Sequence, residues 1–144
     1  MYEITKQKST GSRIVFGIIV FAFITAILRI ALHKPTTSLH DDMIKAANEI
    51  NSHAPIIIDS ATRLDHVNAL AGKVFQYNYT LLKLDRTQVD TDLLKTTGKE
   101  SMIHQMRQDP NIGIFRDNDI EIQVKYLDKN GSDVTTVSIY PTEY

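Results

Sequence analysis

The residues with the most evident chemical potential lie between positions 59 and 66. Asp59, Arg63, Asp65 and His66 place two carboxylates, a guanidinium and an imidazole within this short segment. An aspartate paired with His66 would form an acid/base couple, and Arg63 could hold an anionic group through two hydrogen bonds. The structural alternative is that Arg63 ties the segment to an aspartate and that His66 is solvated. Because the segment has no nucleophile motif and no second carboxylate pair at a defined spacing, the sequence favours the structural alternative.

A second group of candidate residues is aromatic. Phe75, Tyr77 and Tyr79 alternate with Gln76 and Asn78. Aromatic side chains at such positions ordinarily pack across neighbouring strands, and the alternative is a stacking platform for a partner side chain, a glycan or a peptide. No catalytic residue is assigned, and the candidate binding residues are Asp59, Arg63, Asp65, His66, Tyr77 and Tyr79.

Neither a metal nor a cofactor is expected. The five histidines do not show the spacing of metal ligands on one element, and the chain has no cysteine. The segment from Asp128 to Asp133 is similar to a calcium loop, but Lys129 breaks the pattern and the final glutamate is missing. Turn chemistry therefore explains this segment.

The elements that must position the candidate residues begin with a helix predicted from about Leu39 to Ser52. Ser38 begins a capping signature, and apolar residues follow it at helical spacing. Ile56 to Ile58 predicts a short buried strand. Residues 59–72 are rich in small and polar residues, so the Asp59 to His66 group is expected on a long loop or wide hairpin.

Two clear strand patterns lie further along the chain. Val74 to Leu84 alternates until the phase slips at Leu82, which predicts a strand that ends or bulges there. Ile120 to Tyr126 alternates throughout, and Asn130-Gly131 predicts a type I′ hairpin turn to a returning strand over 134–140. Between these patterns, residues 85–108 show helical spacing with a kink or break near Gly98, and 112–115 predicts a short strand.

The predicted fold class is α+β. It consists of an N-terminal transmembrane helix followed by a two-layer domain, in which one antiparallel sheet of four or five strands carries helices on one face. The polar positions of the last two strands predict that the other face of the sheet is wet.

The transmembrane helix is predicted over residues 13–34. Ile14 to Leu28 carries no charge, and the nineteen positions from Ile14 to Leu32 would span roughly 28 Å as a helix, close to the thickness of the hydrocarbon core. Arg29 lies near enough to the end for its side chain to reach the headgroups. A cleaved signal peptide should end in a small-x-small site, and a soluble core helix should show a polar face. Both alternatives fit the sequence less well.

Charge is divided unequally along the chain. Residues 1–34 hold five of the sixteen Lys and Arg and one of the seventeen Asp and Glu, which leaves residues 35–144 with a net charge of −5. An acidic domain disfavours nucleic acid as a partner. Three basic residues precede the span and two follow it. This weak bias places a tail of residues 1–12 in the cytoplasm and an α+β domain of residues 35–144 outside it.

Two short motifs carry a resemblance to known proteins. They are the run from Asp59 to Asp65 (DSATRLD) and the alternating run from Phe75 to Leu81 (FQYNYTL). The chain resembles a group of small bacterial envelope proteins of unknown function that pair a single anchor with a small domain. The resemblance spans most of residues 41–144. It implies a bacterial origin and an envelope location, and it implies no catalytic residues.

These observations predict a membrane-anchored binding or assembly module of the bacterial envelope. The chain would lie in the inner membrane through Ile14 to Leu32, with its domain in the periplasm and an unidentified protein as partner. One alternative is a membrane-tethered enzyme that uses the Asp59 to His66 loop. Another is a small inhibitor or immunity protein, which an acidic domain would suit if the partner is basic.

Overall fold

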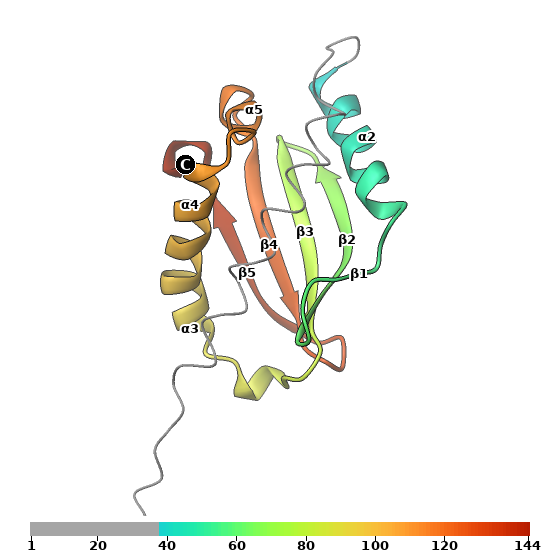
Figure 1. The fold of residues 1–144 in the computed structure, drawn as a ribbon, viewed down its shortest axis with the longest axis vertical. Helices are drawn as coiled ribbons and strands as arrows, with labels where there is room; N and C mark the ends of the chain where they lie inside the picture. The colour runs from blue at the N-terminus through green and yellow to red at the C-terminus, as the bar shows by residue number, and fades with distance from the viewer. Residues whose placement is uncertain (1–37) are drawn as a thin grey trace, which may run out of the picture.

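The computed structural model describes residues 38–144 (Figure 1). The predicted tail and the predicted anchor lie outside the described residues. Within residues 38–144, no helix has both the length and the apolar character needed to cross a membrane. The main elements are α2 (Leu39–Asn51), β1 (Ile56–Ile57), β2 (Thr62–Leu70), β3 (Val74–Leu81), η2 (Arg86–Gln88), α3 (Thr91–Leu93), η3 (Leu94–Gly98), α4 (Lys99–Gln108), α5 (Gly113–Asp117), β4 (Glu121–Leu127), β5 (Asp133–Ile139) and η4 (Pro141–Glu143).

The strands form one five-stranded sheet in the order β1-β2-β3-β4-β5. Three neighbouring pairs are antiparallel, but β3 and β4 are parallel, so the sheet is mixed. The prediction of an antiparallel sheet is therefore wrong at its centre. A hairpin would reverse the chain direction. Residues 82–120 instead carry the chain through five helical elements (η2, α3, η3, α4 and α5) back to the end of the sheet where β3 begins, so β4 runs parallel to β3.

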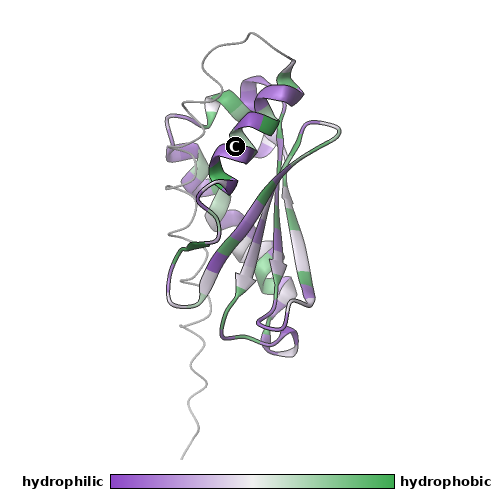
Figure 2. Cartoon of the chain, turned by 90° about the vertical axis from the view of Figure 1, so that its right-hand side faces the viewer, coloured by the Kyte–Doolittle hydropathy of each residue, from purple (hydrophilic) through white to green (hydrophobic). Residues whose placement is uncertain are grey.

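The helices cover one face of the sheet, as predicted. The core on that face joins Met43 and Ile50 of α2 and Met106 of α4 to Tyr77 of β3 and Ile122 of β4. Figure 2 shows apolar and polar residues alternating along the strands, which is the pattern of a sheet with one buried face. We call the opposite face, which carries Gln76, Gln123 and Lys125, the polar face.

Helix α2 forms where the sequence predicts it. The Ser38 hydroxyl accepts a hydrogen bond from the Asp41 amide and caps the first turn. At the other end, the carboxamide of Asn51 donates to the Val67 carbonyl (2.8 Å) and accepts from the Val67 amide (2.7 Å). The last residue of α2 therefore pairs with β2 as a neighbouring strand would.

The expectation of a long loop or wide hairpin over residues 59–72 missed the nine-residue strand β2, which makes up most of this segment and is antiparallel to β1 and β3. Leu64 pairs with Tyr79 and His66 pairs with Asn78, so β2 has one more residue than β3 between these two pairs. Asp65 is the extra residue of this β-bulge. The bulge places two polar residues in succession, and this break in the period of two hides the strand in the sequence.

Two further expectations meet different outcomes. The irregularity near Gly98 is confirmed, because a π-helical turn (Leu94–Gly98) separates α3 from α4. The short strand expected over residues 112–115 is wrong, since helix α5 occupies Gly113–Asp117. Ile112 and Phe115 are both buried, and their spacing of three residues suits a helical turn better than a strand.

The predicted hairpin joins β4 to β5, but its turn is not of type I′. Of the two residues in the Asn130-Gly131 pair, Gly131 alone has a positive φ, of 80°. The buried carboxylate of Asp128 organises the turn instead, because it accepts hydrogen bonds from the amides of Asn130 (2.8 Å), Ser132 (2.9 Å) and Arg86 (3.1 Å). This set of donors fits turn chemistry, as the sequence suggested.

Candidate functional site

The strand β2 carries the polar group that the sequence singled out. Asp65 accepts hydrogen bonds at both carboxylate oxygens, one from Arg63 Nε (2.5 Å) and one from Thr80 Oγ1 on β3 (2.5 Å). All three side chains lie on the polar face, because Arg63 pairs with Thr80 and Asp65 follows Arg63 by two residues on the same strand. Arg63 therefore holds Asp65 within β2, and the hydrogen bond from Thr80 ties the same carboxylate to β3.

The other two members of the group do not join this tie. Among the described residues, the imidazole of His66 is exposed and has no hydrogen bond to Asp65. Asp59 lies before β2, where its carboxylate accepts a hydrogen bond from the Ala61 amide (2.7 Å). Asp59 thus shapes the turn into the strand. The structure brings neither aspartate into a hydrogen bond with His66, so it does not assemble the acid/base couple that the sequence analysis placed below the structural alternative.

The candidate tyrosines lie on the opposite side of the sheet from Arg63. Tyr77 is 1% exposed and Tyr79 is 3% exposed, and both belong to the core. Their rings stack on each other with centroids 6.4 Å apart, and Tyr79 also stacks on Tyr126 at 6.0 Å. Burial raises the pKa of both hydroxyls. The six predicted residues are therefore divided between two faces and a turn.

The rest of the polar face is an internal hydrogen-bond network. Gln76 donates to Gln123 (3.0 Å), and Gln123 donates to Glu121 (2.9 Å). Lys125 forms an ion pair with Asp133 at 2.8 Å. Because these side chains satisfy one another across the strands, the polar face stabilises the sheet and offers few free groups to a ligand.

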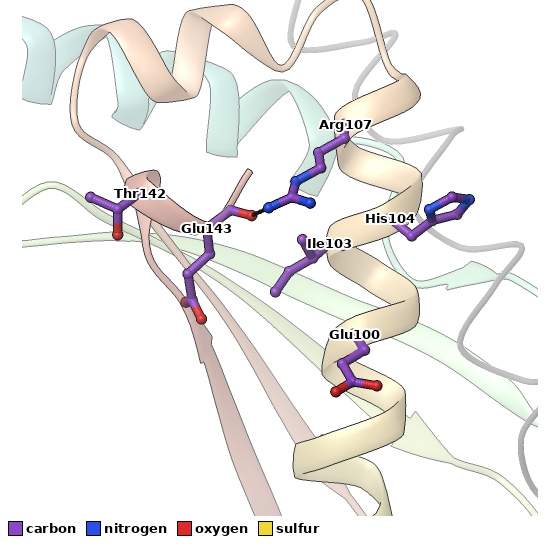
Figure 3. A pocket seen from close by; sticks show the side chains of 6 residues that line it. All are labelled: Glu100, Ile103, His104, Arg107, Thr142 and Glu143. Carbon is purple, nitrogen blue, oxygen red and sulfur yellow. Dashed lines mark hydrogen bonds between the residues drawn. The ribbon is translucent and has the colours of Figure 1, made fainter.

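A different surface is hollowed, and it lies between α4 and η4 (Figure 3). It is an open groove of about 570 Å³. We call it the α4–η4 groove, and its lining residues are Glu100, Ile103, His104, Arg107, Thr142 and Glu143. Figure 3 shows Arg107 reaching toward Glu143, with Ile103 between the two elements and His104 pointing away from Glu143.

Several contacts hold η4 against α4 and so fix the width of the groove. Arg107 Nη2 donates to the Glu143 carbonyl (2.8 Å), and Lys99 Nζ lies 2.8 Å from the Glu143 carboxylate. The same lysine lies 5.7 Å from the centroid of the Tyr140 ring. The buried Tyr144 hydroxyl donates to the carbonyl of Ile120. The groove is consequently a preformed feature of the fold.

Charges in the groove differ in how far they are compensated. Partial burial would raise the pKa of Glu143, but hydrogen bonds from Lys99 and the Tyr140 amide outweigh it and hold the pKa below its usual range. Within the described part of the chain, the carboxylate of Glu100 has neither a hydrogen bond nor an ion pair, and Arg107 uses one of its five donors. Glu100 and Arg107 are thus the groups that could bind a ligand.

The groove is lined by charged, polar and aliphatic side chains. In residues 38–144, no three histidine or acidic side chains come together to hold a metal ion. Sequence reasoning missed the groove because Thr142 and Glu143 are far from α4 in the chain. The one available signal was that Glu100, Ile103 and Arg107 recur at spacings of three and four, and so lie on one side of a helix.

Comparison with known families places this chain. Residues 38–135 match a family described as a domain of unknown function, DUF8479. The match covers more than half of the chain, and the chain therefore belongs to this family. A search of curated proteins finds no match.

The fold is also found in a solved structure. It is similar to a crystal structure from Pseudomonas aeruginosa, described as that of a candidate secreted protein, with a TM-score of 0.61. The similarity covers 74% of this chain and 97% of that one, at 10% sequence identity. At this identity, the comparison shows a shared fold alone.

Proposed function

We propose that this chain is a binding or assembly module of the bacterial envelope. In this proposal, residues 13–34 anchor it in the inner membrane, residues 1–12 form a cytoplasmic tail and the domain lies in the periplasm. The fold shared with a candidate secreted protein supports a place outside the cytoplasm. The net charge of −5 over residues 35–144 disfavours binding to anionic headgroups or nucleic acid and supports a protein partner.

The α4–η4 groove is the observation that carries the proposal. It combines an uncompensated carboxylate (Glu100), a guanidinium with free donors (Arg107) and an aliphatic side chain (Ile103) on one helix. The Arg63–Asp65–Thr80 tie, by contrast, has its acceptors already occupied. A partner therefore gains more from the groove than from the polar face, because the carboxylate of Glu100 has no partner within residues 38–144, whereas both oxygens of Asp65 are occupied.

Site-specific photocrosslinking in cells tests this proposal. A photoreactive phenylalanine analogue is placed at His104, beside the groove, or at Thr136, which is exposed on the polar face. The full-length chain should give defined adducts from position 104 and fewer from position 136. The adducts from position 104 should decrease in a double variant that carries both Glu100→Gln and Arg107→Gln. Adducts from position 136 alone, or none from either position, would contradict the proposal.

A reporter fusion tests the predicted orientation. Fusing a phosphatase that is active only after export behind Tyr144 should give activity, because three basic residues before the span favour a cytoplasmic tail. A fluorescent protein that matures only in the cytoplasm serves as the reciprocal control. Fluorescence without phosphatase activity would overturn the orientation.

A further inference from the structure

The chemistry of a ligand for the α4–η4 groove can be read from the spacing of its groups. Glu100 and Arg107 are seven residues apart on α4, so their Cα atoms are separated by about 10 Å along the helix axis. Ile103 lies between them and is partly buried against the core. The stripe therefore runs from a negative group, over an aliphatic patch, to a positive group.

The neighbouring charges leave both ends of the stripe available. Lys99 pairs with Glu143 and neutralises the second carboxylate of the groove. Arg107 contacts a main-chain carbonyl, which does not neutralise its charge. His104 contacts Gln108 at 2.9 Å on the outer side of the helix. One uncompensated negative charge and one positive charge thus remain for a partner.

We infer that the α4–η4 groove binds a segment of a partner protein that presents a basic and an acidic side chain about 10 Å apart, with an aliphatic side chain between them. The basic side chain pairs with Glu100, the acidic side chain accepts hydrogen bonds from Arg107, and the aliphatic side chain packs on Ile103. In an extended segment, residues i, i+2 and i+4 present their side chains on one side, and the outer two Cα atoms lie about 13 Å apart. The long side chains of lysine and glutamate can bring their charged groups to about 10 Å from each other, so a five-residue segment is long enough. This inference rests on the proposed function and adds the class of ligand.

The test uses synthetic pentapeptides and the full-length chain in an uncharged detergent. The probe is acetyl-Lys-Ala-Leu-Ala-Glu-amide, and two variants replace its lysine or its glutamate with glutamine. Saturation-transfer NMR measures the affinity of each peptide for the wild type, Glu100→Gln and Arg107→Gln. Glu49→Gln on α2 and Arg86→Gln on η2 are matched controls, because both residues are exposed and none of their side-chain atoms has a hydrogen bond within residues 38–144.

The expected result is a pair of double-mutant couplings. Replacing the lysine of the peptide should weaken binding to the wild type by about two- to fivefold and leave binding to Glu100→Gln almost unchanged. Replacing the glutamate of the peptide should likewise weaken binding to the wild type and leave binding to Arg107→Gln almost unchanged. The control variants should behave as the wild type does, and added salt should reduce both couplings.

The outcomes separate this inference from the proposed function. If position 104 gives adducts in cells but neither coupling appears, the ligand class is wrong while the groove stays the binding surface. If the lysine coupling appears equally with Glu49→Gln, binding is unspecific attraction to an acidic domain and the inference is overturned. A circular dichroism spectrum like that of the wild type, measured for each variant, confirms that the surface substitutions have not unfolded the domain.

Discussion

At the scale of single residues, the Arg63–Asp65 pair gives the first prediction. Arg63→Ala removes one of the two donors to Asp65, whose side chain is 19% exposed, and should lower the free energy of unfolding by about 1 kcal/mol. His66→Ala should change it by less than about 0.5 kcal/mol, because exposed side chains contribute little to stability. Urea midpoints of a fragment of residues 35–144 measure both effects. A wild-type midpoint for Arg63→Ala would show that the tie is not structural.

Asp128 gives a prediction about pH. Hydrogen bonds from the Ser132 amide, and then from the Arg86 and Asn130 amides, outweigh the effect of burial and lower the pKa of this carboxyl. A pKa that is lower in the folded state contributes stability above the unfolded value of about 3.9, and this contribution is lost as the pH falls through the folded value. Asp128→Asn should therefore lower stability at pH 7.

The same substitution should flatten the pH dependence below about pH 4, because the carboxyl that titrates has been removed. Urea midpoints of the wild type and of Asp128→Asn are measured in steps between neutral and strongly acidic pH. The two curves of midpoint against pH should converge as the pH falls. Glu143 also has a lowered pKa, so some acid sensitivity should persist in the variant. Curves that stay parallel would mean that Asp128 does not contribute through its charge.

Single residues also show what the sequence could reveal about the site. The favoured reading of Arg63 as a tie to an aspartate agrees with the geometry, because residues two apart on a strand share a face. The groove could not be predicted in the same way. The hydrogen bond from Arg107 to Glu143 joins residues 36 positions apart, and no local pattern encodes such a contact.

At the scale of elements, Asn51 fastens α2 to the edge of β2. Asn51→Ala would leave the partly buried amide and carbonyl of Val67 without these partners and should cost about 1–3 kcal/mol. Asn48→Ala is the matched control, because Asn48 lies on the exposed side of the same helix. Thermal unfolding should show a lower midpoint for Asn51→Ala and an unchanged or higher one for Asn48→Ala. Equal midpoints would mean that the two hydrogen bonds between Asn51 and Val67 do not contribute to stability.

Elements with an unbroken period were predictable, and interrupted ones were not. Helix α2 and strands β3, β4 and β5 follow the sequence pattern because each presents one continuous apolar stripe. Strand β2 was hidden by its bulge at Asp65, and α5 was too short for its spacing to be distinguished from a strand. The parallel pairing of β3 and β4 depends on the path of residues 82–120, which no local alternation records.

At the scale of the whole molecule, the anchor is a prediction from sequence, because residues 13–34 lie outside the described part of the chain. Replacing Ile18 and Ile19 with arginine should abolish membrane association, since each charge at the centre of a span costs roughly 2.5–3.5 kcal/mol on insertion scales. Sedimentation of carbonate-washed membranes measures the effect. Substituting leucine at both positions is the control and should leave the protein in the pellet. A double-arginine variant that still pellets would refute the assigned span.

The parallel centre of the sheet also sets the order in which a nascent chain can fold. Val74 of β3 pairs with Glu121 of β4, and Phe75 pairs with Ile122 beside it. At 5–20 residues per second, a ribosome needs about 2–9 s to synthesise the intervening chain, so β3 waits that long with one edge unpaired. During this interval its aromatic residues lack their later neighbours. Misassembly at that edge is therefore most favoured while residues 82–120 are being made, in the second half of synthesis, when a chaperone would have to shield the edge.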